Sequence, residues 1–233
     1  MAEKEAADAS DTLVFEQDFS QLEQSLEEET WEVDDDDETL ELYTPEAKDA
    51  EPGAVMVTKG GLASVAELVH QFGSGWKVSR LCMELVCESI DLDSNGTFTV
   101  GLAFDDDLEE AVLLACTIRR PRPETKLPRE PGDPPEEAEP PKPIALHVNG
   151  QVAEEDLGEL PKRIELDVQL NWEEKTTLVK HKVRESPTSA EESATSTGFY
   201  TTDVAFDVAK AVFLRATGSV RVRLLSLKCS CDT

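Results

Sequence analysis

Apolar and polar residues alternate over several short stretches of this chain, as in strands that bury one face. Leu81, Met83 and Leu85 fall on one face of residues 80–88, and a second alternating stretch covers residues 97–104. The turn between them contains Asn95-Gly96, a favoured hairpin loop, so we predict that the two stretches pair as a hairpin. Their apolar faces should point into a core, because a slip of one residue would turn them to water.

The alternation returns towards the C-terminus. Residues 144–148 lead into Asn149-Gly150 and predict a second hairpin, and residues 164–172 give the most regular half-buried strand. The closing strand, residues 219–231, changes its facing at Leu224-Leu225, which predicts a bulge. Further strands are predicted at residues 176–183, 200–206 and 211–214, and residues 109–119 are either a buried strand, which their β-branched and small residues favour, or a helix.

Two segments have a helical rather than a strand-like pattern. Residues 10–29 carry one apolar stripe, with Ser10 or Asp11 as the N-cap. The stripe consists of Phe15, Phe19, Leu22 and Leu26. We expect this helix either to dock on its own domain or to fold onto a partner or a neighbouring subunit. A second, short helix is predicted at residues 60–70, before Gly73-Ser74-Gly75 interrupts it.

The charge is divided unevenly along the chain. The net charge is −28, and residues 1–51 contain 20 acidic and 2 basic residues, including the run from Asp34 to Glu38. We therefore predict an acidic N-terminal arm over residues 1–52, mostly disordered or docked on a partner, ahead of a domain over residues 53–233. Its apolar residues would be the protein-binding anchors: Phe15, Phe19, Leu22, Leu26 and Trp31.

About eight strands and few helices predict an all-β fold, an antiparallel β-sandwich. Residues 120–143 hold nine of the thirteen prolines, so they cannot form a ladder or a helix. We predict that they form an internal loop, since neither half alone has enough strands for two sheets. A division into two small domains at this point stays open.

Composition limits the compartment. The N-terminus lacks a basic and apolar leader, and no apolar run approaches the length of a membrane helix. The five cysteines are odd in number and lie in strand-like surroundings, which favours reduced thiols. We therefore expect a cytoplasmic or nuclear protein that is neither secreted nor bound to a membrane.

No motif for catalysis or a cofactor is present. The three histidines lie outside any nucleophile motif, and His147 is predicted to be solvated on the polar face of a strand. A zinc site of four thiolates is disfavoured because Cys82 and Cys87 would face opposite sides of a strand. The acidic residues 105–110 lack the glycine and ligand spacing of a calcium loop. We predict no enzyme activity, no metal and no cofactor.

A low pI disfavours nucleic acid as the main partner, because phosphates bind clustered Lys and Arg. The pI of this chain is near 4.3. A local basic patch is the weaker candidate for nucleic acid, and its residues are Arg119, Arg120 and Arg122.

Residues 78–107, an apolar strand, a polar turn and a strand ending in Asp105-Asp106-Asp107, resemble the early strands of small icosahedral virus coat proteins. Residues 216–224 are similar to the closing strand of such jelly rolls, and the plant-virus movement proteins share the pattern, with Asp105 after the strand. The resemblance implies a jelly roll that tiles by self-association or with a sister structural protein. The coat proteins commonly carry a basic arm, whereas this arm is acidic, so it should contact protein rather than genome.

The sequence thus predicts a non-enzymatic assembly protein, most simply a viral coat-type subunit whose arm contacts its neighbours and whose location would be the virion. A cellular acidic adaptor or chaperone-like module, with a basic protein as the partner of the arm, is the first alternative. A viral movement protein is the second.

Overall fold

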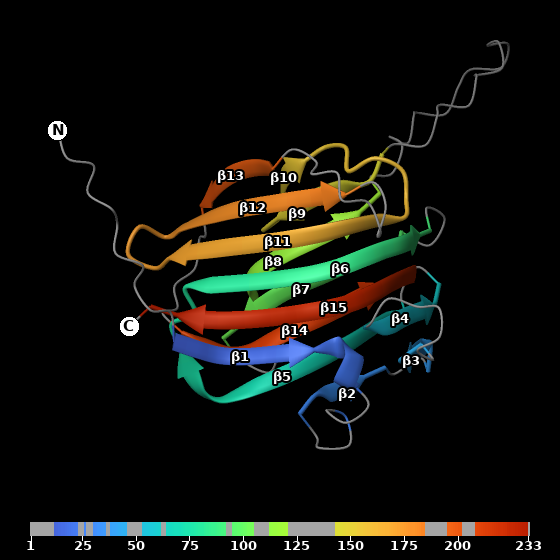
Figure 1. Ribbon diagram of the computed structural model, residues 1–233, viewed down its shortest axis with the longest axis horizontal. Coiled ribbons are helices and arrows are strands. Elements are labelled where there is room, and N and C mark those ends of the chain that lie inside the picture. The colour runs from blue at the N-terminus through green and yellow to red at the C-terminus, as the bar shows by residue number, and fades with distance from the viewer. Residues whose placement is uncertain are drawn as a thin grey trace, which may run out of the picture.

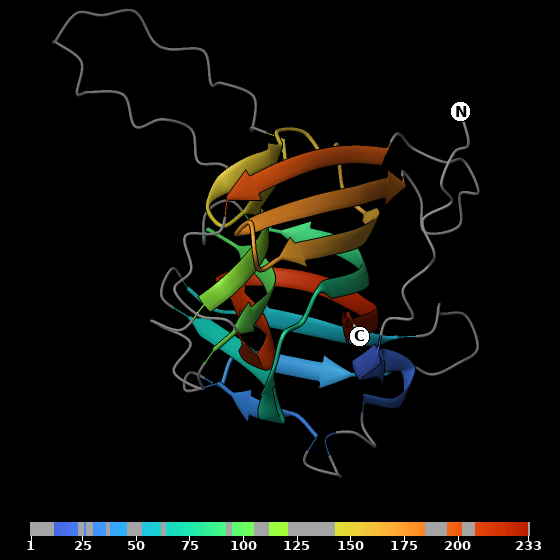
Figure 2. The ribbon, with the colours of Figure 1, turned by 90° about the vertical axis from the view of Figure 1, so that its left-hand side faces the viewer.

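A computed structural model describes residues 12–22, 26, 30–35, 38–45, 53–61, 64–91, 95–104, 112–120, 143–184, 195–201 and 208–232. These residues form fifteen strands, more than the eight expected, in two antiparallel sheets that pack face to face (Figures 1 and 2). The predicted antiparallel β-sandwich is confirmed.

The eight-stranded sheet, here called sheet A, lies in front in Figure 1, in the order β13-β12-β11-β6-β15-β4-β3, with β1 also paired to β15. Its strands are β1 (Thr12–Asp18), β3 (Leu40–Tyr43), β4 (Ala54–Lys59), β6 (Arg80–Ile90), β11 (Lys162–Asn171), β12 (Thr176–Arg184), β13 (Thr195–Thr201) and β15 (Ser219–Cys231).

The seven-stranded sheet, sheet B, lies behind it in the order β10-β9-β8-β7-β14-β5-β2. Its strands are β2 (Glu32–Asp34), β5 (Val65–Trp76), β7 (Thr97–Ala103), β8 (Val112–Arg119), β9 (Ala145–Val148), β10 (Gln151–Glu154) and β14 (Ala209–Thr217). The core between the sheets consists of their inward apolar residues, such as Leu85 and Ile164 from sheet A and Phe98 and Leu214 from sheet B.

The first predicted hairpin is right in its strands and wrong in their pairing. β6 belongs to sheet A and pairs with β11 and β15, whereas β7 belongs to sheet B and pairs with β8 and β14. Asn95 has a positive φ of 53°, but Gly96 does not, so the connection lacks the two left-handed residues of a type I′ hairpin. It carries the chain from one sheet to the other.

The second predicted hairpin is confirmed. Asn149 and Gly150 both have positive φ, 47° and 79°, and Gln151 pairs with Val148 across the turn. The predicted bulge in β15 is also confirmed, since its register on β6 shifts between Leu224 and Ser226. The strands predicted at residues 164–172 and 176–183 correspond to β11 and β12, which pair with each other.

The predicted helix at residues 60–70 is wrong, because Val65–Trp76 is strand β5. Its inner face contributes Ala66 and Leu68 to the main core, and Val69 is buried on the other face. A strand that is covered on both faces loses the alternation by which strands are recognised.

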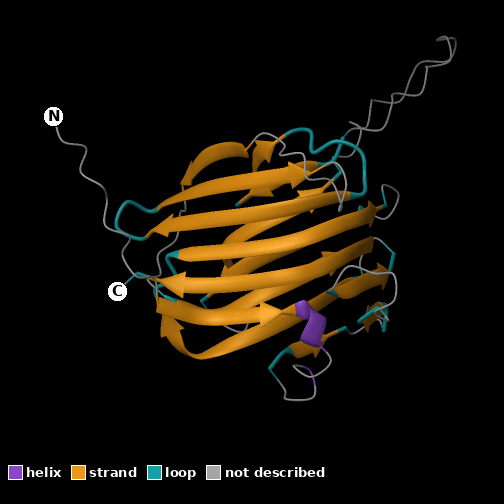
Figure 3. Ribbon diagram, in the orientation of Figure 1, coloured by secondary structure: helices purple, strands orange, loops and turns teal. Residues whose placement is uncertain are grey.

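The predicted helix at residues 10–29 is wrong over Thr12–Asp18, which is strand β1 (Figure 3). A 3₁₀ turn, η1 (Phe19–Gln21), follows, and the carboxylate of Asp18 accepts a hydrogen bond from the backbone N–H of Ser20 at 2.9 Å. β1 runs antiparallel to the end of β15, with Thr12 opposite Cys231. Backbone pairing along an open edge therefore outweighs the helical spacing.

The boundary predicted at residues 52/53 divides strands that belong to one fold. β1, β2 and β3 all precede it, and they pair with β15, β5 and β4. Asp35, from the aspartate run, accepts hydrogen bonds from the backbone N–H groups of Thr39 and Leu40. Residues 1–11 and most of the predicted loop at 120–143 lie outside the described residues.

Candidate binding groove on the outer face of sheet A

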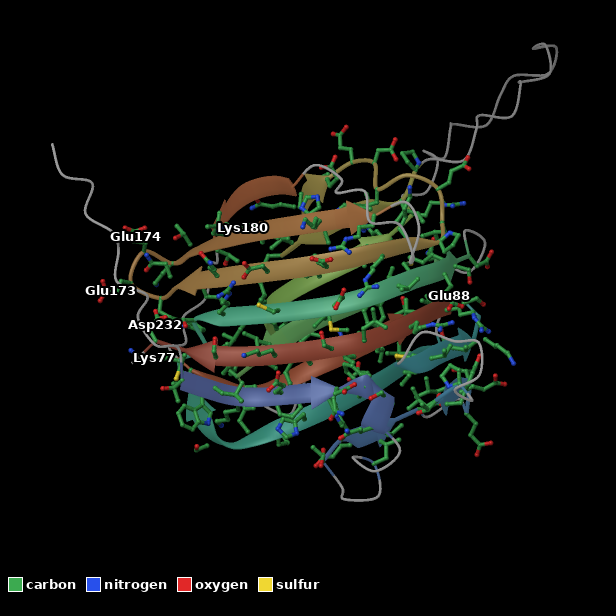
Figure 4. The ribbon with its side chains drawn as sticks, viewed as in Figure 1. Lys77, Glu88, Glu173, Glu174, Lys180 and Asp232 are labelled. Atoms are coloured by element: carbon green, nitrogen blue, oxygen red, sulfur yellow. The ribbon has the colours of Figure 1, made fainter. Side chains whose placement is uncertain are left out.

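The outer face of sheet A is hollowed where β1, β15, β6, β11 and β12 lie side by side, the face turned to the viewer in Figure 4. One hollow of about 500 Å³ extends to Lys180 on β12. A second, also of about 500 Å³, adjoins it at Glu16, Glu84 and Ser226 and extends to Asp18. Together they form one elongated groove that crosses the strands.

The strand register places the groove residues in two rows across the sheet. The first row consists of Glu16, Lys228, Cys82, Asp167 and Lys180, on β1, β15, β6, β11 and β12. The second row consists of Asp18, Ser226, Glu84, Glu165 and Lys182.

Short side chains make the floor of the groove. Cys82 stands in the middle of the first row, and Ser226 lies in the second row next to the β15 bulge. Their neighbours along and across the strands, such as Arg80, Glu84 and Lys228, are long and charged. The hollow therefore results from short side chains that stand among long ones. The strands beneath it remain paired.

Asp167 is fixed in one wall by a bidentate ion pair. Arg80 Nε and Nη2 donate to Asp167 Oδ1 and Oδ2 at 2.8 and 3.0 Å. Such a fork holds both planar groups in one orientation. The thiol of Cys82 lies 3.7 Å from Asp167 Oδ1, and burial together with Asp167 raises the pKa of this thiol. Cys82 is therefore an unreactive floor residue.

Glu84 and Glu165 stand directly opposite each other on β6 and β11. Two like charges at this position repel, and each is neutralised by an arginine. Arg163 Nε donates to Glu84 Oε1 at 2.7 Å, and Arg184 Nη2 lies 2.7 Å from Glu165 Oε1. The groove thus presents oriented donors and acceptors along its length.

Two lysines of the groove lack such partners. Among the residues that the structure describes, neither Lys180 nor Lys228 has a carboxylate oxygen within 4.0 Å of its Nζ. Lys180 is half-buried and Lys228 is exposed. Both ammonium groups are therefore available to a ligand.

The predicted protein-binding anchors lie elsewhere and are covered by the chain itself. Phe15, Phe19, Leu22 and Trp31 are at most 9% exposed, and Leu26 packs against the same core. Phe15 also stacks on His70. A partner could reach these buried side chains only if the segments that cover them moved, and their binding to another protein stays a prediction.

The predicted basic patch is described only in part and stays a prediction. Arg119 is exposed at the end of β8 and its Nε donates to His147 Nε2 at 2.9 Å. Arg120 is half-buried, and Arg122 lies outside the described residues. His147 is buried rather than solvated as predicted, and burial and the charge of Arg119 lower its pKa.

The cysteines and acidic groups of the described residues bear on the predictions about metal and thiol chemistry. The described part of the chain contains no group of three or more His, Cys, Asp or Glu residues that could hold a metal ion. All five cysteines are free thiols, and burial raises the pKa of Cys87, Cys116 and Cys229 to about 12. The acidic residues 105–110 lie outside the described residues.

No helix in the described residues is long and apolar enough to cross a membrane.

A comparison of the sequence with protein-family models and with curated proteins finds no match. Solved structures show a shared fold. A Bauhinia forficata lectin in complex with GalNAc is 9% identical, with a TM-score of 0.52 over 96% of this chain and 100% of the lectin. A Lotus tetragonolobus seed lectin and the lectin UEA-II in complex with galactose are each 8% identical, with TM-scores of 0.51 over 88% of this chain and 94% of theirs.

The fold is therefore the jelly-roll-like β-sandwich of the legume lectins. None of these similar structures is a virus coat protein, so the resemblance expected from the sequence is unconfirmed beyond the sandwich itself.

Proposed function

We propose that this chain is a non-catalytic glycan-binding module that holds its ligand in the groove of sheet A. The elongated groove with its fixed arginine–carboxylate pairs is the observation that carries the proposal. Neighbouring hydroxyls of a sugar both donate and accept hydrogen bonds. A wall such as Arg80–Asp167 offers both functions at fixed positions.

The fold supports the same class of ligand. Two lectins of similar fold were captured with galactose or GalNAc, as their names state. At identities below 10%, the similarity supports a shared fold but not a shared ligand. The proposal for this chain therefore rests on the chemistry of its groove.

The carboxylates of the groove favour binding over hydrolysis. Glu84, Glu165 and Asp167 each accept hydrogen bonds or ion pairs from an arginine. The arginines hold both oxygens of Asp167 and one oxygen each of Glu84 and Glu165, and a carboxylate held in an ion pair is a poor general acid for a glycosidic bond.

A bulky side chain placed on the floor of the groove tests the proposal. Ser226→Trp should lower the affinity for glycans at least tenfold, because the indole would occupy the hollow beside Glu84. Ser74→Trp, at an exposed serine outside the groove, is the control and should bind as the parent does. An array of neutral, uronate-containing and sulfated oligosaccharides, followed by calorimetric titration, gives the measurement. Binding to none of them, or equal binding by both variants, would reject the groove.

A second candidate is the assembly role predicted from the sequence, and exposed apolar residues on edge strands favour it. Leu13 on β1, Val33 on β2 and Val152 on β10 are 49%, 49% and 50% exposed. Each of these strands pairs with only one other strand among the described residues. An edge strand can pair with another chain.

Light scattering on the full chain tests this candidate. If β10 forms a subunit contact, the parent should elute as a defined oligomer and Val152→Lys should elute as a monomer, because a charged edge resists pairing. Val65→Lys, at a similarly exposed valine on the internal strand β5, should leave the oligomer intact. A parent that stays monomeric at all concentrations excludes assembly.

A further inference from the structure

We infer that the groove selects acidic oligosaccharides, whose carboxylate or sulfate groups bind Lys180 and Lys228. This inference rests on the proposed glycan-binding function and names the class of glycan.

Three of the five carboxylates in the two rows are neutralised within the protein, whereas Glu16 and Asp18 on β1 have no arginine or lysine partner among the described residues. Arg163 neutralises Glu84, and Arg184 neutralises Glu165. Arg80 does the same for Asp167. Glu16 on β1 is the remaining carboxylate of the first row, and it lies beside Lys228 at the far end of that row.

Lys182 already has an interaction within the protein, so Lys180 and Lys228 are the lysines of the groove that remain, and an unpaired ammonium favours an anion. Lys180 stands opposite Asp167, but the carboxylate of Asp167 is already engaged in the fork with Arg80. Because the wall is partly buried, a charge-assisted hydrogen bond formed there is stronger than one in open solvent.

The spacing of the two lysines indicates a ligand with more than one anionic group. Lys228 is on β15 and Lys180 is on β12, with β6 and β11 between them. Three strand spacings place their backbones roughly 14 Å apart. Side chains stand roughly perpendicular to a sheet, so ammonium groups at this spacing suit a chain of sugar units with repeated acidic groups better than a single small anion.

The net charge of −28 does not prevent such binding. At physiological salt, charges farther away than about 8 Å are largely screened, so the groups that line the groove dominate. The same screening makes contacts with the lysines dependent on ionic strength, and binding should weaken as salt is raised.

The experiment compares the parent, the double variant Lys180→Ala/Lys228→Ala, and Lys77→Ala on the same array. Lys77 is an exposed lysine outside the groove, at the end of the sheet in Figure 4, and serves as the control. We expect uronate-containing or sulfated oligosaccharides to bind, with at least a tenfold loss in the double variant and none in Lys77→Ala. Which of the two acidic sets binds distinguishes carboxylate from sulfate.

Other outcomes separate this inference from the proposed function. If only neutral glycans bind, or if the double variant binds acidic glycans as the parent does, acidic selection is wrong and the glycan-binding function stands. If no glycan binds, both are wrong. Equal affinity for polyglutamate would identify the ligand as an acidic peptide and overturn the inference.

Discussion

Gly101 lies in the middle of β7, on the outer face of sheet B, where a side chain has no room. A Cβ at this position would lie 2.2 Å from the carbonyl oxygen of Leu114 and 2.5 Å from Cζ of Phe213. Phe213 is itself only 1% exposed, and Arg215 lies over its ring. This glycine therefore allows the ring to cover the strand.

Gly101→Ala should lower the free energy of unfolding by about 1–3 kcal/mol, because the methyl group would clash with the backbone oxygen of Leu114 and overpack the contact with Phe213. Gly61→Ala is the matched control, since a Cβ there meets nothing within 4 Å. Urea denaturation of both variants gives the values. Equal stability of the two would show that the β8 backbone at Leu114 and the ring of Phe213 both move aside without cost.

The groove shows how far single residues could be predicted. The alternation in residues 80–88 places Arg80, Cys82 and Glu84 on one polar face, and the structure agrees. It does not identify Asp167 as the partner of Arg80, because that contact depends on the register between strands 87 residues apart. The sequence signal for this contact is the presence of complementary charges at alternate positions of β6 and β11.

At the scale of elements, β1 shows why a strand can have the residue spacing of a helix. Phe15, Phe19, Leu22 and Leu26 do repeat at helical intervals, but Phe15 and Gln17 are both buried, as alternate residues of a strand can be. Gln17 accepts a hydrogen bond from the indole of Trp31 at 3.0 Å. A buried glutamine breaks the apolar alternation, so the pattern resembled a helix.

Phe19→Ala should therefore destabilise the whole domain. The side chain is fully buried at the junction of β1 and η1, and the loss of a buried Phe costs about 3–5 kcal/mol. Leu13→Ala, at a leucine of β1 that is 49% exposed, should change stability by no more than about 0.5 kcal/mol. Chemical denaturation followed by tryptophan fluorescence measures both. If the free energy of unfolding of Phe19→Ala equals that of the parent, the segment does not contribute to the domain and is an arm, as the uneven charge predicts.

The pairing of β6 and β7 is an error of the same kind. Alternation and an Asn-Gly turn indicate two strands and a reversal of direction. A reversal joins either two neighbours in one sheet or two strands in facing sheets. The dihedral angles of Asn95 and Gly96, which decide between these, depend on what surrounds the turn.

At the scale of the whole molecule, the structure changes the meaning of the charge division. Strands from the acidic segment complete sheet edges, with β2 beside β5 and β3 beside β4. The groove crosses the centre of sheet A, where most carboxylates are paired with arginines. Net charge by segment thus says little about the charge that a ligand would meet.

The sequence by itself determined the β class, most of the strands, the Asn149-Gly150 hairpin and the bulge in β15, because these depend on residues close together in the chain. The tertiary structure decided which strands share a sheet, how β1 docks on β15, and that short side chains at Cys82 and Ser226 leave a groove between charged walls. Those features depend on register between distant strands. Register is set by the packing of the two sheets as a whole, which no local pattern contains.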